Sequence, residues 1–370
     1  MNSAATRAAT KIVKLTPPPR ATKDNMIGFN FGIRPYRKGG VRMEKQIYKD
    51  KIFYHNYGHG GAGVSLTFGC ANHIINIFKQ DVDINKSQKK PIAVLGSGYM
   101  GLMEAIILTD LGFQVTVYAK AFPKSTLGMY EDKEACITSQ VAGGLWMPFG
   151  LDIQDKPLHF VLGKQTYDFY RKCMEEKKYK GLSYKSVYII DAPNPILEFC
   201  PPALINYEQI QVDFGNGKLH DATHFTSMLI DGDVFLNELY EEAKKKGVNF
   251  VKQDFNDILD LCNLKENHIF NCSGSSSSVL FNDSNIFPVV GHLLYMKKVP
   301  QVDYFLSAGT KNGKMRVTCY PQSNKLAVGL TYEERGWLDK PDPESVKQLI
   351  SNLDEFHDWR VGNTNPNPKL

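Results

Sequence analysis

A glycine-rich segment at residues 96–101, with the sequence GSGYMG, has the composition of a turn that binds phosphate. It follows an apolar run at 91–95 and precedes apolar residues at helical spacing over 102–113. A second run of β-type composition occupies residues 115–118. Dinucleotide binding requires a glycine turn between a strand and a helix, because the first N–H groups of the helix face the pyrophosphate. The segment therefore predicts a dinucleotide site.

The three glycines of this segment have separate roles. Gly96 permits the tight turn, Gly98 lets the backbone approach the pyrophosphate, and Gly101 lets the helix pack close to the strand. An Asp or Glu normally ends the second strand and holds the ribose hydroxyls, but Lys120 stands at that place. A lysine cannot accept those hydrogen bonds, although it could reach a phosphate. We therefore expect the cofactor to bind with weakened affinity.

A second glycine loop stands in front of the first. Residues 55–71, HNYGHGGAGVSLTFGCA, contain five glycines and two histidines and run into an apolar helical pattern. His55 and His59 are four residues apart, which is the spacing of a zinc pair on a helix. The glycines that follow disfavour a helix there. We therefore expect no metal site and interpret both histidines as hydrogen-bonded packing residues.

Four further segments resemble the D-amino-acid oxidase family, a family of FAD-dependent flavoproteins that includes D-aspartate oxidases. Residues 138–149, TSQVAGGLWMPF, resemble its flavin-contacting loop, and residues 224–232, HFTSMLIDG, resemble its entry into the mid-chain helix. Residues 271–274, NCSG, are similar to the end of its second FAD-binding strand, and residues 327–337 resemble a substrate-domain strand. The resemblance implies FAD as the cofactor.

The glycine loop at 55–71 and the segment GIRPYR at 32–37 resemble motifs that lie at the C-terminal end of the family's chains. Here both lie near the N-terminus. Domain termini are often close together at the surface, so we interpret this order as a circular permutation, natural or engineered. Residues 28–80 would then be the family's C-terminal piece, and the polar segment 80–90 would join it to the first strand.

The resemblance implies an α/β fold with two domains interleaved along the chain. One is a doubly wound, Rossmann-like FAD-binding domain, and the other is a mainly antiparallel-sheet substrate domain that caps the flavin. A chain of 370 residues is long enough for two cores. We expect the FAD-binding domain at 52–150 and 222–290, the substrate-binding domain at 28–51, 151–221 and 291–357, a disordered basic tail at 1–27 and a flexible C-terminal tail at 358–370.

The expected cofactor contacts follow from the glycine turn and, for the rest, from the resemblance. The helix that begins near Gly63 would direct its N-terminus at the reduced flavin ring, where negative charge is favoured. The serine run after Gly274 is interpreted as a loop near the pyrophosphate. The predicted cofactor-binding residues are Gly58, Gly60, Gly61, Gly63, Val64, Gly96, Gly98, Tyr99, Met100, Gly101, Lys120, Thr138, Ser139, Gly143, Gly144, Leu145, Phe255, Ser273 and Gly274.

Arg34 is the main candidate for substrate binding. A guanidinium can hold a carboxylate through two parallel hydrogen bonds, and the resemblance gives the matching arginine that role. A structural arginine before a proline is the alternative interpretation. Gly61 is a further candidate in the glycine loop.

The expected substrate strand departs from the family pattern. A tyrosine usually stands three residues before its proline, where this chain has Thr318, and we expect Tyr320 to point to the opposite face. Vertebrate-type members add a second tyrosine where this chain has Lys314, whereas in fungal-type members it follows a Gly-x-Thr in the next strand, as Tyr332 does. Members that act on acidic substrates tend to have an arginine there, so Tyr332 favours a neutral substrate; a half-buried strand aromatic is the alternative.

The resemblance implies an oxidoreductase that oxidatively deaminates a neutral D-amino acid. The α-hydrogen passes as hydride to FAD, oxygen reoxidises the flavin to give hydrogen peroxide, and the imino acid hydrolyses to a keto acid and ammonia. No catalytic acid or base of the protein is required. Two alternatives stay open: a glycine- or sarcosine-type amine oxidase or dehydrogenase, and a degenerate flavin-fold binding protein without catalysis, which Lys120, Thr318 and Lys314 suggest.

Composition argues against other kinds of partner. The net charge of +5 matches five cations without an acid in residues 1–23, so the remaining chain is nearly neutral and no nucleic-acid partner is expected. No apolar run reaches the roughly 18 residues that a membrane helix needs. Seven scattered cysteines favour a reducing compartment. We expect a cytoplasmic protein; the final residues Pro368-Lys369-Leu370 give a weak peroxisomal alternative, and a homodimer is compatible with the sequence.

Overall fold

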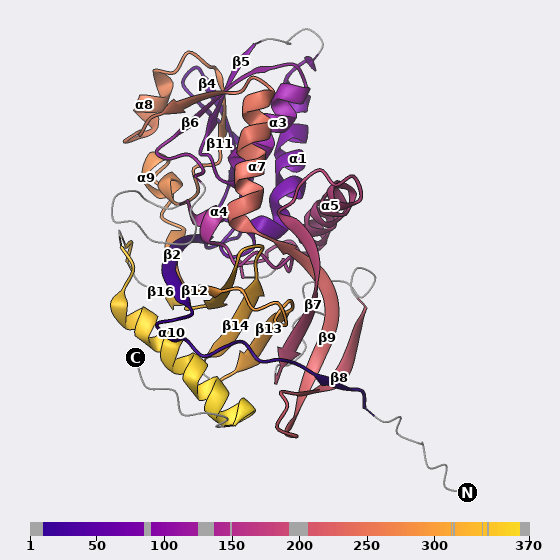
Figure 1. Ribbon diagram of the computed structural model, residues 1–370. Coiled ribbons are helices and arrows are strands. Elements are labelled where there is room, and N and C mark those ends of the chain that lie inside the picture. Colours follow the sequence, from indigo (N-terminus) through magenta and orange to yellow (C-terminus); the bar gives the residue numbers. More distant parts are fainter. Residues whose placement is uncertain are drawn as a thin grey trace, which may run out of the picture.

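The computed structural model contains two sheets with helices packed around them (Figure 1). It describes residues 10–84, 90–124, 137–148, 150–191, 206–311, 313, 315–334, 336–338 and 340–362. Phe149, Lys314 and the C-terminal tripeptide lie outside the described residues. No helix in the described part of the chain is long and apolar enough to cross a membrane.

The smaller sheet is the dinucleotide-binding unit that the glycine turn predicts. Its six strands lie in the order β10-β6-β5-β11-β4-β3, and all neighbours except β3 and β4 run parallel. Helices α1, α3 and α7 pack on one face, and α8 packs on the other. The elements of this unit are β3 (Arg42–Tyr48), β4 (Lys51–Tyr57), α1 (Gly63–Asp81), β5 (Pro91–Leu95), α3 (Tyr99–Asp110), β6 (Gln114–Ala119), α7 (Gly232–Lys245), β10 (Asn249–Lys252), α8 (Ile258–Cys262) and β11 (His268–Asn271).

The larger sheet has ten strands, and most of its neighbours run antiparallel. Helix α10 lies across one face, where its apolar side chains pack on β12, β14 and β15. The elements here are β1 (Ile12–Lys14), β2 (Met26–Arg37), β7 (Leu182–Ile190), β8 (Tyr207–Asp213), β9 (Leu219–Ile230), β12 (Ile286–Lys297), β13 (Phe305–Gly309), β14 (Arg316–Pro321), β15 (Lys325–Gly329), β16 (Glu333–Glu334) and α10 (Pro343–Phe356). The short helices α4 (Thr138–Val141), η1 (Gly274–Ser276) and α9 (Ser277–Leu280) lie between the sheets, and α5 (Lys156–Glu175) packs on α1.

This architecture confirms the predicted fold class, an α/β chain with a Rossmann-like domain and a mainly antiparallel domain. The two units are interleaved, because β2 pairs along its length with β12 while β3, β4 and α1 belong to the smaller sheet. Three domain boundaries differ from the expectation. Strand β12 begins at residue 286 in the larger sheet, inside the range expected for the FAD-binding domain. Residues 42–51 lie in the smaller sheet rather than the substrate unit, and β9 extends through residue 230 in the larger sheet.

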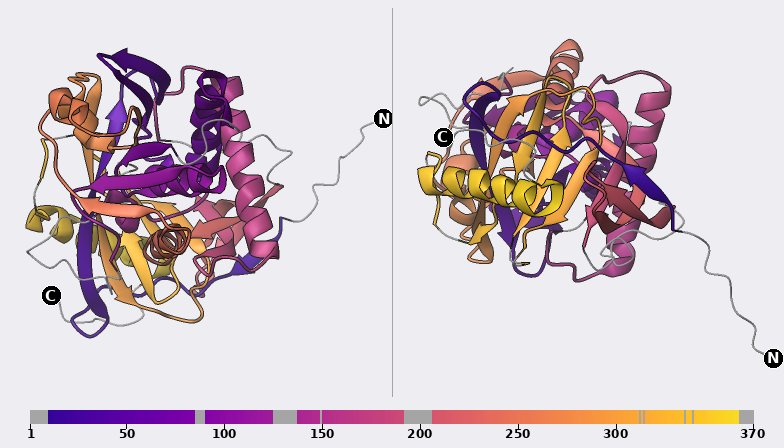
Figure 2. Two further views of the ribbon diagram at one scale, coloured as in Figure 1. Left: turned by 90° about the horizontal axis from the view of Figure 1, so that it is seen from above. Right: turned by 60° about the horizontal axis from the view of Figure 1, so that its bottom comes forward.

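The disordered tail expected at residues 1–27 is wrong from residue 10 onward. Strand β1 pairs in parallel with β8, and the following segment runs across the larger sheet to α10 (Figure 2). The guanidinium of Arg20 forms ion pairs with Asp354 and Asp358. The hydroxyl of Tyr304 donates to the carbonyl of Thr16. Arg20 therefore binds acidic groups of the fold instead of remaining in solvent. Residues 1–9 lie outside the described part.

The flexible C-terminal tail expected at 358–370 also begins later than predicted. Residues His357–Val361 form one turn of π-helix after α10. The side chain of Arg360 is fully buried and donates to the Asp191 carboxylate at 2.7 Å and to the Gly309 carbonyl at 2.8 Å. These bonds fix the turn against the larger sheet. Residues 363–370 are not among the described residues.

Candidate functional site

A cavity of about 830 Å³ lies between the two sheets. Its floor is formed by the residues that follow β4, β5, β6, β10 and β11, which is the edge where open parallel sheets bind ligands. Its other wall comes from β2, β12 and β14 of the larger sheet. The predicted site residues that line this cavity are Arg34, Gly60, Gly61, Gly63, Val64, Gly96, Gly98, Tyr99, Met100, Lys120, Thr138, Ser139, Gly143, Gly144, Leu145, Phe255, Ser273, Gly274 and Tyr332.

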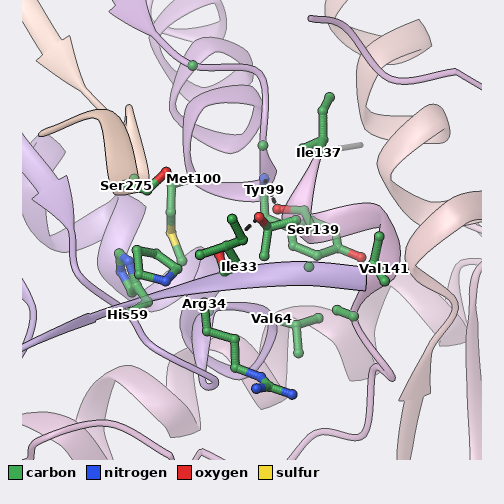
Figure 3. Close-up of a pocket in the computed structure, with 18 of the residues that line it drawn as sticks. Ile33, Arg34, His59, Val64, Tyr99, Met100, Ile137, Ser139, Val141 and Ser275 are labelled. Atoms are coloured by element: carbon green, nitrogen blue, oxygen red, sulfur yellow. Dashed lines mark hydrogen bonds between the residues drawn. The ribbon is translucent and has the colours of Figure 1, made fainter. Parts of the chain in front are cut away.

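The glycine turn after β5 has the geometry that the sequence predicts. Gly96 has φ +99°, and a Cβ atom built on it would lie 2.5 Å from the carbonyl oxygen of Cys272. A Cβ on Gly101 would lie 2.0 Å from the carbonyl oxygen of Gly96, so Gly101 permits close packing and does not itself line the cavity. Gly98 is the N-cap of α3. The N–H group of Tyr99, the first residue of the helix, donates a hydrogen bond to the Ser139 hydroxyl at 3.3 Å (Figure 3).

The second glycine loop places another helix N-terminus at the cavity. Helix α1 begins at Gly63, its N-cap Ala62 supplies no side-chain acceptor, and no acidic residue stands in its first turn. The free N–H groups at such a terminus favour an anionic or electron-rich ligand. Gly58 differs from the prediction: it lies outside the cavity lining, and a Cβ on it would lie 2.8 Å from the Arg37 side chain.

The loop at 138–145 packs closely between the two sheets. The Thr138 hydroxyl donates to the Ile33 carbonyl at 3.1 Å. Gly144 has φ +94°, and a Cβ there would lie 1.8 Å from the carbonyl oxygen of Ile230. A Cβ on Gly143 would meet the Tyr320 ring at 2.4 Å. Both glycines therefore let this loop lie against the larger sheet while its backbone faces the cavity.

The two histidines of the second loop have different surroundings. His55 is buried on β4 and shares hydrogen bonds with Gln46 at 2.8 Å and Asn271 at 3.0 Å, as predicted. His59 lines the cavity, and its buried Nε2 has no hydrogen-bond partner among the described residues. Burial lowers the pKa of His59 to about 3, so its ring is neutral at ordinary pH. The prediction of a hydrogen-bonded packing residue is therefore wrong for His59. No group of three metal-ligating side chains occurs in the described part of the chain.

Arg34 lies on β2 with its side chain on the opposite side of the strand from Ile33 (Figure 3). Its Nη2 donates to the Thr331 carbonyl at 3.3 Å, whereas its buried Nη1 has no partner. Burial lowers the pKa of Arg34 below its ordinary value, and no described carboxylate forms an ion pair with it. Glu333 acts on Arg34 only from beyond ion-pair distance, so the buried guanidinium has no ion-pair partner among the described residues, and its arrangement favours an anionic ligand. The guanidinium fits here because a Cβ on Gly291 would lie 2.2 Å from Nη2.

The predicted side-chain directions on the substrate strand, β14, are wrong: Tyr320 reaches the cavity and Thr318 does not. Thr318 and Tyr320 are two residues apart, so their side chains share a face of β14. Val317 and Cys319 point to the opposite face, into the core beneath α10. Tyr320 lines the cavity and Thr318 does not, because the larger side chain extends further from the strand. Burial raises the pKa of Tyr320, and the positive charge of Arg34 opposes that rise.

Tyr332 lines the cavity as predicted, beside a tyrosine that the sequence analysis did not single out. Its ring contacts Tyr36 edge to face, with 5.8 Å between the centroids. Tyr36 lies two residues after Arg34 on the same strand face, and burial raises its pKa. About 54% of Tyr332 is exposed, so it stands at the rim rather than deep in the cavity. The period of two along β2 would have identified Tyr36.

Three other residues of the site were missed. Tyr320 was assigned to the wrong face, although the period of two along β14 gave the correct one. Gly291 lies on β12 and became recognisable only through its pairing with β2. Asp254 follows β10 and forms an ion pair with Lys120 at 3.0 Å. A single sequence does not reveal that β10 lies next to β6.

FAD fits the donor set of this cavity. Two helix N-termini without side-chain caps, those of α1 and α3, point at it. The glycines of the turn after β5 would hold the pyrophosphate, and the loop at 138–145 together with Gly60 and Gly61 would hold the flavin. The fold and the site thus define a dinucleotide-binding protein with a buried arginine in the wall opposite the glycine turn.

Comparison with known proteins specifies the class. The family model DAO, described as FAD dependent oxidoreductase, matches residues 91–358. A D-amino-acid oxidase from Fusarium vanettenii is 35% identical over 290 residues, which cover 71% of this chain and 77% of that protein. The D-aspartate oxidase of Homo sapiens is 25% identical over 277 residues, covering 70% of this chain and 74% of that protein. A glycine oxidase structure from Bacillus cereus ATCC 14579 aligns with a TM-score of 0.49 at 12% identity, covering 72% and 78% of the two chains.

The chain belongs to the FAD dependent oxidoreductase (DAO) family, and it is an oxidoreductase with FAD as its cofactor. The matched range begins at β5 and leaves out residues 1–90, among them residues 28–80. Those residues nevertheless supply β2, β4 and the α1 terminus to the same cavity. The circular permutation stays a prediction.

Proposed function

We propose that the protein oxidatively deaminates a neutral D-amino acid. The observation that carries the proposal is Arg34, a buried guanidinium that lines the cavity with one unpartnered nitrogen and no described counterion. A substrate carboxylate would accept two hydrogen bonds from this group and neutralise its charge. The charge of the bound substrate thereby replaces the missing counterion.

The side chains around Arg34 favour a substrate without a second acidic group. Tyr36, Tyr320 and Tyr332 face this part of the cavity, together with the apolar Phe305 and Leu330. Among the described lining residues the only other lysine or arginine is Lys120, which stands at the end of β6 in the smaller sheet. An acidic side chain would therefore be desolvated here without an opposite charge, at a cost of several kcal/mol by order of magnitude.

The protein's part in the reaction is orientation. Bound FAD supplies the hydride acceptor, and its reoxidation by oxygen releases hydrogen peroxide. Arg34 would fix the carboxylate, and the tyrosine rings would limit the rotation of the substrate about that anchor. No described carboxylate lines the wall from the larger sheet, although the Glu333 carboxylate on β16 acts on Arg34 from outside the lining.

A peroxide-coupled assay tests this proposal. The FAD-loaded protein is assayed against paired D- and L-amino acids with neutral, acidic and basic side chains, and against glycine and sarcosine. We expect peroxide from neutral D-amino acids and much less from D-aspartate or any L-enantiomer. Turnover limited to glycine or sarcosine would replace the proposal with an amine-oxidase activity, and an absence of peroxide with every substrate would contradict it.

A further inference from the structure

The cavity contains one carboxylate among its described lining residues, Asp254. The other charged lining residues are Arg34 and Lys120. A carboxylate repels an anionic dinucleotide. We therefore expect a carboxylate beside such a ligand only where it accepts hydrogen bonds from the ligand. The position of Asp254 indicates which part of the ligand could donate them.

Asp254 lies at the end of the smaller sheet where an adenosine half would be bound. Strand β10 pairs in parallel with β6, with Lys252 opposite Ala119, and the Gln253 N–H donates to the Ala119 carbonyl at 3.0 Å. The residues after both strands therefore emerge side by side. In a Rossmann-like unit the end of the second strand, here β6, is where an acid holds the ribose hydroxyls. Lys120 occupies that position in this chain.

The Asp254 carboxylate is held by one oxygen and open at the other. Its Oδ1 accepts from the Lys120 ammonium at 3.0 Å and from the Phe255 N–H at 2.9 Å. Its Oδ2 accepts no hydrogen bond within the described part of the chain. The Phe255 ring contacts Tyr118 with 5.9 Å between centroids, and both rings line the cavity next to the carboxylate. A fixed acceptor beside two aromatic rings suits a ribose diol with its attached base.

We propose that Asp254, which follows β10, accepts the hydrogen bonds of the adenosine ribose hydroxyls of FAD, and that Lys120 orients Asp254 for this contact. The acid absent from the end of β6 is thus supplied by the neighbouring strand, and the lysine that replaces it is the partner of that acid. The ion pair is exposed, with about 60% of each side chain accessible, so its own contribution to stability is small. We expect the ion pair to hold the Asp254 carboxylate in position before FAD binds.

The test measures FAD binding rather than turnover. Apoprotein is titrated with FAD, with FAD carrying a 2′-deoxyadenosine or a 3′-deoxyadenosine half, and with FMN, and binding is followed by flavin fluorescence. Asp254→Asn should weaken FAD about 10- to 100-fold, because a hydrogen bond to a charged acceptor is lost. It should leave the affinity for FMN unchanged, because FMN has no adenosine. Lys120→Met should weaken FAD less than Asp254→Asn does.

The deoxy analogues distinguish a ribose contact from a structural effect. At least one of them should bind the wild type as weakly as FAD binds Asp254→Asn, and the substitution should then cause no further loss. The matched control is Asp110→Asn, which removes another exposed carboxylate paired with a lysine, Lys246, in the same unit but away from the cavity. It should bind every ligand as the wild type does.

Three results would overturn the proposal. These are equal weakening of FAD and both analogues by Asp254→Asn, a larger effect of Lys120→Met, and unchanged FAD affinity in Asp254→Asn. Because no amino-acid substrate is present, the outcome is independent of the function proposed above. A protein that oxidises no D-amino acid would still show the ribose contact.

Discussion

Replacement of Arg34 by methionine separates a substrate anchor from a structural arginine. The wild-type guanidinium is buried, has an unpartnered Nη1 and forms no ion pair with a described carboxylate. Methionine has a similar length and no charge, so it removes an uncompensated buried charge without leaving a large cavity. Within the described part of the chain, the one hydrogen bond that it removes is the 3.3 Å bond to the Thr331 carbonyl. We therefore expect Arg34→Met to fold with an unchanged or raised Tm.

Arg34→Met should lower substrate turnover, although its Tm is unchanged or raised. Two charge-assisted hydrogen bonds to a carboxylate contribute about 3–5 kcal/mol, which corresponds to a fall of roughly two to four orders of magnitude in kcat/KM. Arg34→Lys keeps the charge but loses the planar pair of donors, so it should retain part of the activity. FAD affinity should stay at the wild-type value, because Arg34 belongs to the wall opposite the glycine turn.

The assays are thermal unfolding of the FAD-loaded protein and steady-state kinetics with a neutral D-amino acid. An amine without a carboxylate, if it is oxidised at all, should be oxidised equally by wild type and Arg34→Met. A structural arginine would give the reverse pattern: a Tm lowered by several degrees with kcat/KM nearly unchanged. That pattern would refute the assignment of Arg34 as the anchor.

Three further predictions concern neighbouring groups. Gly291→Ala should lower kcat/KM without affecting FAD binding, because the new Cβ would lie 2.2 Å from the Arg34 Nη2 and displace the guanidinium; unchanged kinetics would show that the guanidinium does not act from this position. Tyr320→Phe should raise KM about tenfold through loss of one hydroxyl beside Arg34, with FAD affinity as the control; an unchanged KM would place the hydroxyl outside the substrate site. Burial raises the pKa of Glu104 to about 8, so the folded protein keeps a proton there that the unfolded chain releases above its ordinary pKa. Its contribution to stability should therefore fall as pH rises toward 8 and level off above it, and the difference in unfolding free energy between wild type and Glu104→Gln, measured by denaturant at several pH values, should follow that curve. A flat difference would contradict it.

The local motifs predicted much of the cofactor half of the site. Gly96 and Gly101 are set by backbone geometry within a single strand–turn–helix unit, so the sequence alone identifies their roles. Their spacing does not depend on the rest of the fold. The same holds for the helix N-terminus at Gly63, which begins where the glycine loop ends.

Contacts between distant strands were the part that sequence could not supply. Gly291 and Arg34 meet because β12 pairs with β2 across the larger sheet, and Asp254 meets Lys120 because β10 pairs with β6. Neither pairing has a local signature. The tail at 1–27 was misjudged for a similar reason, since the acidic partners of Arg20 lie at the other end of the chain. Tyr320 differs from these cases, because the alternation of side chains along β14 is a local signal that places it on the same face as Thr318.

Anaerobic reduction of the bound flavin would show directly whether the protein oxidises a neutral D-amino acid. The FAD-loaded protein is mixed without oxygen with one enantiomer of a neutral amino acid, and the visible flavin band is followed over time. We expect the D-enantiomer to bleach the band and the L-enantiomer to leave it unchanged, and we expect Arg34→Met to bleach far more slowly at equal FAD content. Bleaching by neither enantiomer, or by both at equal rates, would contradict it.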